Sequence, residues 1–104
     1  LSISQAGYNT AADILRAGCR SIMVPYATGG ETEQTLRATK LAERDLTCAI
    51  METELTPHRL AQAIDERMEK APPGTSHGLD LAGAGRAART LLEASKRFSM
   101  LTAR

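Results

Sequence analysis

The sequence has few aromatic residues, no tryptophan, no long apolar run and no excess of charge of either sign. Aromatic side chains make up 3% of the 104 residues, so aliphatic side chains and alanine must form the core. Because no run approaches the roughly 20 apolar residues that span a bilayer, we expect no transmembrane helix. Thirteen basic and twelve acidic residues give a net charge of +1. Nucleic-acid binding, which calls for a marked basic patch, is therefore not expected.

Cysteine is also scarce. Cys19 and Cys48 each lie in or beside an apolar segment, and no further cysteine lies at the short spacing that a metal site needs. We expect two reduced, buried thiols. His58 and His77 have no carboxylate or cysteine partner at a useful spacing, so a catalytic or metal-binding role is not expected for either.

Short apolar segments alternate with helical patterns along the chain, which predicts strands that are each followed by a helix. Gly18 is placed as a C-terminal helix cap, and Thr56-Pro57 is typical of a helix start. The alternation predicts an α/β fold: a three-stranded parallel sheet in sequential order, flanked by helices. The predicted strands are 1–4, 19–25 and 47–52; the predicted helices are 10–17, 32–44, 57–70 and 80–98, with a loop at 71–78 before the last helix.

Three strands make a thin sheet, and parallel strands are usually covered on both faces. Leu1 is not a methionine, and it falls within an apolar pattern. We therefore expect residues 1–104 to form a single partial domain, with neighbouring strands in sequence that precedes residue 1.

Ligands of open α/β sheets bind at the carboxyl edge of the strands. In the first loop at that edge, Gly7 lets a ligand approach the backbone, and the next helix offers its N-terminus to a phosphate. Asn9 or Thr10 is expected to cap that helix, and Asp13 can accept hydrogen bonds from a ribose diol. An ordinary tight turn with a capped helix explains the same residues, so both interpretations stay open. The loops expected at this edge are 5–9, 26–31 and 53–55.

The second loop, "TGGETEQ" at 28–34, has two glycines followed by polar residues that enter a helix. Glu33 and Gln34 would lie in the first helical turn, where paired acceptors and donors suit sugar hydroxyls. A mobile loop before acidic residues that favour a helix N-terminus is the alternative.

The stretch "AGYNTAADILRAG…IMVPYATGGETEQTLRATKLAERDL" resembles the C-terminal domain of GT-B glycosyltransferases. It is most similar to the family 28 type, which includes the transferase that adds N-acetylglucosamine to the lipid intermediate of peptidoglycan. Within that type it resembles a bacterial subgroup described as predicted glycosyltransferases. The resemblance covers residues 1–46 well and extends more loosely through the third helix. It implies the second half of a Rossmann-like domain that binds the donor.

The resemblance also implies a role for each site position. The ribose falls on Asp13, where Asp replaces the commoner Glu, and the donor sugar falls on Glu33 and Gln34. No metal and no cofactor are expected, since helix N-termini can balance the diphosphate charge, and no catalytic residue is identified. The positions implied for the nucleotide diphosphate are Ala6, Gly7, Tyr8, Asn9 and Thr10.

By this resemblance, the intact protein transfers a sugar from a nucleotide-diphosphate donor, a UDP-sugar, to an unknown acceptor. The chain alone is expected to be inactive, because the acceptor site and the candidate base of this fold lie in an N-terminal domain that this sequence lacks. A nucleotide-sugar epimerase of similar fold and a non-catalytic interaction module remain alternatives. We expect a cytoplasmic location, with attachment to the inner face of the membrane left open.

Overall fold

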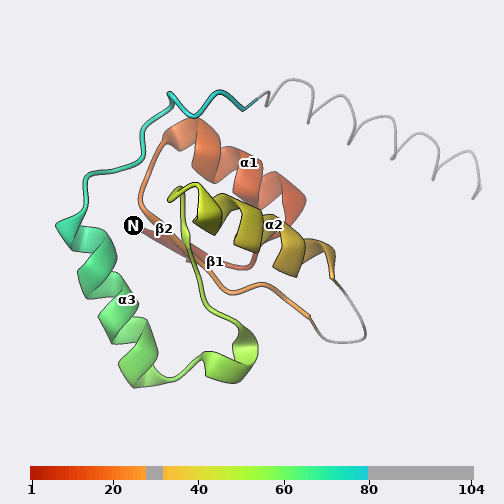
Figure 1. The fold of residues 1–104 in the computed structure, drawn as a ribbon, viewed down its shortest axis with the longest axis vertical. Helices are drawn as coiled ribbons and strands as arrows, with labels where there is room; N and C mark the ends of the chain where they lie inside the picture. The colour runs from red at the N-terminus through yellow and green to blue at the C-terminus, as the bar shows by residue number, and fades with distance from the viewer. Residues whose placement is uncertain (28–31, 80–104) are drawn as a thin grey trace, which may run out of the picture.

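The computed structural model describes residues 1–27 and 32–79, which form a three-stranded sheet with helices on both faces (Figure 1). The predicted α/β order is confirmed. The helix predicted at 80–98 and residues 28–31 of the second loop lie outside the described residues. The elements are β1 (Ser2–Ser4), α1 (Tyr8–Ala17), β2 (Ser21–Met23), α2 (Glu33–Glu43), β3 (Cys48–Ala49), the short 3-10 helix η2 (Glu52–Glu54) and α3 (Pro57–Glu69).

The central strand of the sheet is β2, which pairs in parallel with β1 on one side and with β3 on the other. This confirms the predicted parallel sheet in sequential order. Ile22 is opposite Ile3 of β1 and Cys48 of β3, and Met23 occupies the next position along the strand. Because successive strand residues point to opposite faces, Ile22 and Met23 contribute to different sides of the sheet.

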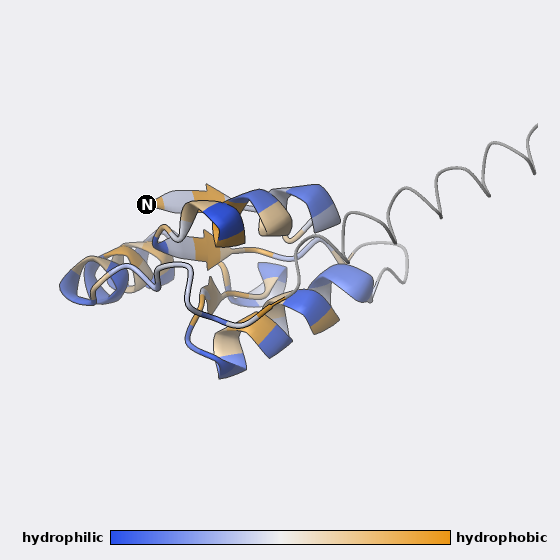
Figure 2. Cartoon of the chain, turned by 90° about the horizontal axis from the view of Figure 1, so that it is seen from above, coloured by the Kyte–Doolittle hydropathy of each residue, from blue (hydrophilic) through white to orange (hydrophobic). Residues whose placement is uncertain are grey.

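The core has two parts, one on each face of the sheet. Figure 2 shows α3 on one side of the strands and α1 with α2 on the other. Met23 lies in the cluster under α1 and α2, whereas Ile22 lies in the cluster under α3. Each of these fully buried side chains contributes about 1.5–3 kcal/mol by leaving water. The first cluster comprises Ala6, Ala11, Ile14, Leu15, Met23, Ala38, Leu41 and Leu46, and the second Ile22, Ile50 and Ala63.

The cap predicted for the N-terminal end of α1 is wrong, whereas the one predicted for its C-terminal end is confirmed. Gly7 is the N-cap residue, with φ −61° and ψ 152°, and no side chain caps the helix. The prediction that Asn9 or Thr10 forms the cap is wrong, because the helix begins at Tyr8 and both residues lie within its first turn. The predicted C-terminal cap is present: Gly18 is left-handed at φ 64°, and its N–H donates to two carbonyls of the last turn.

The start of α3 agrees with its sequence pattern. Thr56 Oγ1 accepts a hydrogen bond from Arg59 N at 3.0 Å, and Pro57 is the first helical residue. Proline suits this position because its missing N–H would have no intrahelical partner there.

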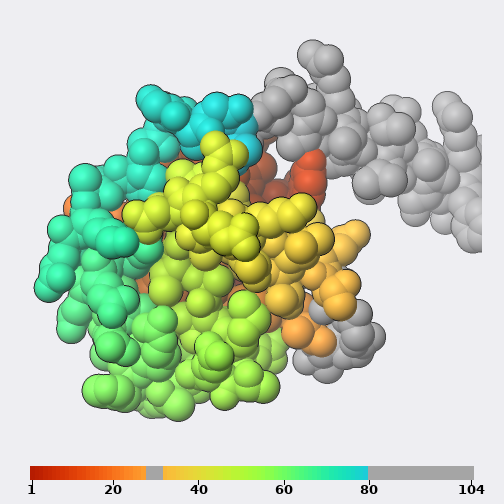
Figure 3. Space-filling view, viewed as in Figure 1, coloured from red at the N-terminus to blue at the C-terminus, as the bar shows by residue number. Residues whose placement is uncertain are grey.

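Residues 71–79 fold back from α3 onto the C-terminal end of α1 (Figure 1). Leu79 N donates to His77 Nδ1 at 3.1 Å, so Nε2 carries the ring proton and donates to Leu15 O at 3.3 Å. The segment contains no helix or strand, as predicted for 71–78. In Figure 3 its cyan atoms lie beside α2 on the surface. His77 therefore has a structural role that its sequence context does not reveal.

Cys19 and Cys48 are both free thiols, as expected. They are half-buried and not fully buried, because Cys19 only borders the cluster under α1 and Cys48 only borders the cluster under α3.

Gly18→Ala is expected to destabilise the fold more than Gly74→Ala. Both glycines have positive φ, 64° and 73°, where an L-residue costs roughly 1–2 kcal/mol. A Cβ at Gly18 would lie 2.8 Å from the carbonyl carbon of Gly74, whereas a Cβ at Gly74 would have no atom of the described residues within 4 Å. Urea unfolding measures the two losses in unfolding free energy. Equal losses would contradict the close packing of 71–79 on α1.

Asp45 joins the turn after α2 to α3. Its Oδ1 lies 2.9 Å from Arg67 Nη2 and 3.1 Å from Lys70 Nζ. The hydrogen bond from Arg67, and then the one from Lys70, lower the pKa of Asp45 below its ordinary value of 3.8. Asp45 has φ 57°, a left-handed conformation that Asn also tolerates.

We predict that Asp45→Asn lowers the unfolding free energy at neutral pH by less than about 1 kcal/mol, since the Asp45 carboxylate is 63% exposed to solvent that screens it, although Arg67 is only 12% exposed. The folded-state pKa is the lower one, so the stabilisation is present above pH 3.8 and is lost as the pH falls through the lowered value. Urea unfolding across this range should show the wild type and the variant converging in acid. A constant difference would be inconsistent with a charge interaction. Asp65→Asn, on the same helix as Arg67, is the control.

Candidate functional site

The N-termini of α1 and α2 lie next to each other at the carboxyl edge of the sheet (Figure 1). Residues 5–7 lead from β1 into α1, and the chain after β2 leads toward α2. Because the three strands are parallel, their following loops share one edge, which is where open α/β sheets bind ligands.

One side chain of α2 connects the first two of these loops. Gln34 Oε1 accepts hydrogen bonds from Ala6 N at 3.2 Å and from Tyr26 N at 2.9 Å. Both partners are donors, so the carbonyl oxygen of the carboxamide faces them and its NH₂ group points elsewhere. The structure therefore brings Gln34 into direct contact with the loop that contains Gly7.

A second side chain of α2 holds the same loop from its carbonyl side. Arg37 Nη1 donates to Ala6 O at 2.6 Å, and the guanidinium carbon lies 5.2 Å from the centre of the Tyr8 ring. Ala6 is fully buried, at 0% exposure. Both of its polar main-chain groups thus obtain their partners from α2, as burial requires.

Gly7 is not required by its backbone or by its packing. Its φ and ψ are open to any residue, and the nearest described atom to an added Cβ would be Thr10 Oγ1 at 4.0 Å. The first N–H groups of an α-helix have no intrahelical partner, and no side chain caps α1. Within the described residues, the start of α1 therefore directs its first main-chain N–H groups, and the positive end of its dipole, toward the carboxyl edge of the sheet.

The two acidic candidates occupy different places. Glu33 is the first residue of α2 and directly precedes Gln34, so it lies at the same edge. Asp13 is about one turn further along α1 than Asn9, on the same helix face. Its side chain is 77% exposed, and its Oδ1 lies 3.4 Å from Arg16 Nη1.

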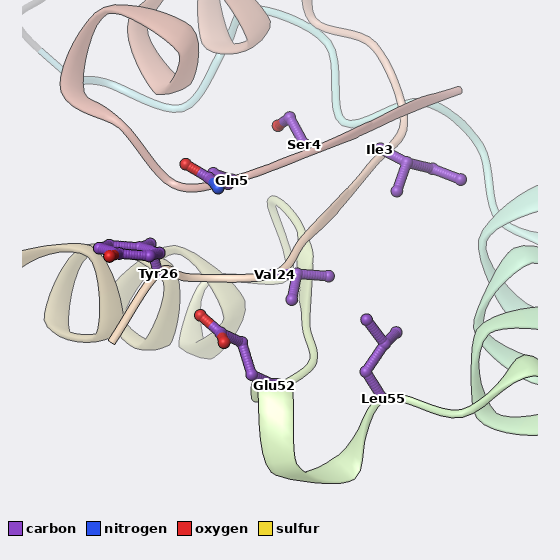
Figure 4. A pocket seen from close by; sticks show the side chains of 7 residues that line it. All are labelled: Ile3, Ser4, Gln5, Val24, Tyr26, Glu52 and Leu55. Carbon is purple, nitrogen blue, oxygen red and sulfur yellow. The ribbon is translucent and has the colours of Figure 1, made fainter. Parts of the chain in front are cut away.

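The third loop at this edge contains η2. Glu52 Oε1 accepts a hydrogen bond from Ala27 N at 3.2 Å, so a side chain after β3 holds the chain that follows β2. Figure 4 shows Glu52 and Tyr26 beside a groove of about 380 Å³ at the ends of the strands. The apolar part of its wall is formed by Ile3, Val24 and Leu55.

The sequence patterns did not single out Arg37 or Glu52. A signal for Arg37 was present, since it follows Gln34 by three residues and such pairs share a helix face. No local pattern indicates Glu52, because its contact with Ala27 depends on how β2 and β3 are placed side by side. Tyr26 contributes its main-chain N–H, for which side-chain identity gives no signal.

Within residues 1–27 and 32–79 there is no group of three or more His, Cys, Asp or Glu side chains that could hold a metal ion. The helices of this part of the chain are all too short or too polar to cross a membrane. The charged side chains at the carboxyl edge include Arg37, Glu33 and Glu52.

Comparison with known families identifies the class to which this domain belongs. The model of the glycosyltransferase family 28 C-terminal domain matches residues 1–78. This match includes every strand and helix that the structure describes. The chain therefore belongs to this family, and the predicted GT-B assignment and Rossmann-like fold are confirmed.

Two curated relatives carry the name UDP-N-acetylglucosamine--N-acetylmuramyl-(pentapeptide) pyrophosphoryl-undecaprenol N-acetylglucosamine transferase. The one from Desulforamulus reducens is 36% identical over 67 residues, which cover 64% of this chain and 18% of the relative. The one from Syntrophotalea carbinolica is 29% identical over 72 residues, which cover 69% of this chain and 20% of the relative. The chain thus spans 18–20% of the length of these relatives. No solved structure gives a significant match.

We predict that Gln34→Leu raises the hydrogen-exchange rates of the Ala6 and Tyr26 amides by about tenfold or more, because both lose their acceptor. Gln34→Glu is the matched control, since a carboxylate still accepts both hydrogen bonds and should keep the amides protected. Exchange rates measured by NMR that do not change in Gln34→Leu would show that this connection is absent in solution.

Proposed function

We propose that the chain is the donor-binding part of a glycosyltransferase that moves a sugar from a nucleotide-diphosphate sugar, a UDP-sugar, to an acceptor. Membership of the family supports a nucleotide sugar as donor. The names of the two relatives, both UDP-N-acetylglucosamine transferases, favour uridine as the nucleoside of that donor. The observation that carries the proposal is the N-terminus of α1, where the N-cap residue is Gly7, which has no side chain, and where Gln34 contacts the preceding loop.

The diphosphate would bind across the start of α1, at Gly7, Tyr8, Asn9 and Thr10, while buried Ala6, whose N–H and C=O are both paired with α2, would support the loop. A phosphate suits this position because main-chain N–H groups and the helix dipole both favour an anion. Gly7 supports this, since neither its own backbone conformation nor its packing against the described residues gives a reason for glycine there.

The same groups would contribute to the chemical step. When the bond between the anomeric carbon and the diphosphate oxygen breaks, the electron pair stays on that oxygen and negative charge builds on the leaving group. Fixed N–H donors stabilise charge that develops in the transition state more than charge already present in the bound donor. The loop would therefore increase the rate as well as the affinity.

Asp13 would accept hydrogen bonds from the ribose hydroxyls, and Glu33 with Gln34 would bind the sugar. Asp13 is exposed and lies on the same helix face as Asn9. It is therefore accessible to a nucleotide whose diphosphate lies at the start of α1. The orientation of Gln34 supports a role in sugar binding. Its oxygen accepts hydrogen bonds from the Ala6 and Tyr26 amides, so its NH₂ group points away from them. A carboxylate and a carboxamide in sequence supply both acceptors and donors to sugar hydroxyls.

The acceptor and the catalytic base would come from an N-terminal domain of the intact protein. The printed names of the relatives include a pyrophosphoryl-undecaprenol acceptor. A lipid-linked acceptor would place the enzyme in the cytoplasm at the inner face of the membrane.

Titration calorimetry of the intact protein with UDP tests the proposal. We expect binding by the wild type and a loss of about tenfold or more in Gly7→Val, whose methyl groups would occupy the space in front of the amides. The fold should survive, since φ −61° and ψ 152° suit valine and the position is open.

Asp13→Ala should lower the affinity for UDP by a comparable factor, whereas Asp65→Ala, on α3, should leave that affinity unchanged. Unaltered affinity in Gly7→Val, with an unaltered melting temperature, would remove the loop from the site. Wild-type protein that does not bind UDP would refute the proposed donor.

A further inference from the structure

We propose that Arg37 is a positioning residue for the diphosphate site, an inference that rests on the proposed function. Arg37 belongs to α2, while the main-chain donors it would position belong to the start of α1. Its role would be to hold the backbone on both sides of Gly7 in the geometry that an anion requires.

The first contact fixes the residue before Gly7. Arg37 Nη1 donates to Ala6 O at 2.6 Å, and Gln34 Oε1 accepts from Ala6 N at 3.2 Å. Two side chains one helical turn apart on α2 therefore hold the N–H and the C=O of one buried residue. Rotation of the backbone at Ala6 would break both hydrogen bonds in a site that offers little water to replace them.

The second contact reaches the residue after Gly7. The guanidinium carbon of Arg37 lies 5.2 Å from the centre of the Tyr8 ring, within the range of a cation–π interaction. Tyr8 is the first residue of α1. A single guanidinium thus contacts both neighbours of Gly7.

This arrangement offsets the flexibility of glycine. Gly7 leaves space for a ligand, but a residue without Cβ has more backbone freedom than any other. Donors stabilise a developing charge well only when they are held in place beforehand. Arg37 suits this task better than lysine, because a planar guanidinium can donate to a carbonyl while it lies over a ring.

The experiment compares UDP with uridine, which lacks the diphosphate, by titration calorimetry of the intact protein. Arg37→Met keeps the aliphatic part of the side chain but loses both contacts. We expect this variant to lower the affinity for UDP by about tenfold and the affinity for uridine by less than about twofold. Arg37→Lys can still donate to Ala6 O and should recover part of the UDP affinity. Lys40→Met removes a positive charge from the next turn of α2 and should leave UDP affinity within about twofold.

Each result decides the inference. Unchanged UDP affinity in Arg37→Met would overturn it, and equal losses for UDP and uridine would assign Arg37 a general structural role instead. If Arg37→Met does not fold, Arg37→Lys carries the test, with an expected UDP loss of about threefold and unchanged uridine binding. Wild-type protein that binds neither ligand would refute the proposed function, and the role of Arg37 with it.

Discussion

The two hydrogen bonds from Ala6 N and Tyr26 N to Gln34 are the constraint on which the carboxyl edge of the sheet depends. They join loops that follow different strands to the first turn of α2. The amide of fully buried Ala6 is costly to leave unpaired, and the same oxygen also accepts from the more exposed Tyr26, so this single atom ties both loops together. The N-terminus of α1 is held beside that of α2 as a consequence. Any ligand at this edge meets donors from one helix and side chains from the other.

Gly7 and Gly18 lie at opposite ends of α1, and they differ in whether the fold itself requires a glycine at that position. Gly18 is required by the chain itself, since its φ of 64° and the nearby backbone of Gly74 exclude a Cβ. Gly7 has an ordinary backbone conformation, and among the described residues the atom nearest to an added Cβ would be Thr10 Oγ1 at 4.0 Å. Gly18 therefore stabilises the fold, whereas nothing in the described part of the chain requires glycine at position 7. This contrast supports a bound anion more strongly than the presence of a glycine loop alone.

The order of elements could be predicted because it depends on local patterns. Apolar spacing, a glycine after a helix and the Thr56-Pro57 pair each act within a few residues, and all three agree with the structure. The Asn9 or Thr10 cap failed because two polar residues in a first turn do not show which residue the helix starts from. The resemblance to the family identified Gln34 as a site residue. Its contacts with the amides of Ala6 and Tyr26 could not be predicted, because they depend on how α2 packs against the two loops. Residues 80–104 lie outside the described part of the chain.

Local sequence patterns were sufficient to predict the α/β class, the parallel order of the strands and a glycine loop before a helix. These features follow from periodicity and from backbone preferences, which neighbouring residues settle among themselves. Two contacts came to light in the folded chain alone: Arg37 contacts both neighbours of Gly7, and Glu52 supports the chain after β2. Such contacts join residues about thirty or twenty-five positions apart. They form only after the strands have paired and the helices have packed, because no local preference brings those atoms together.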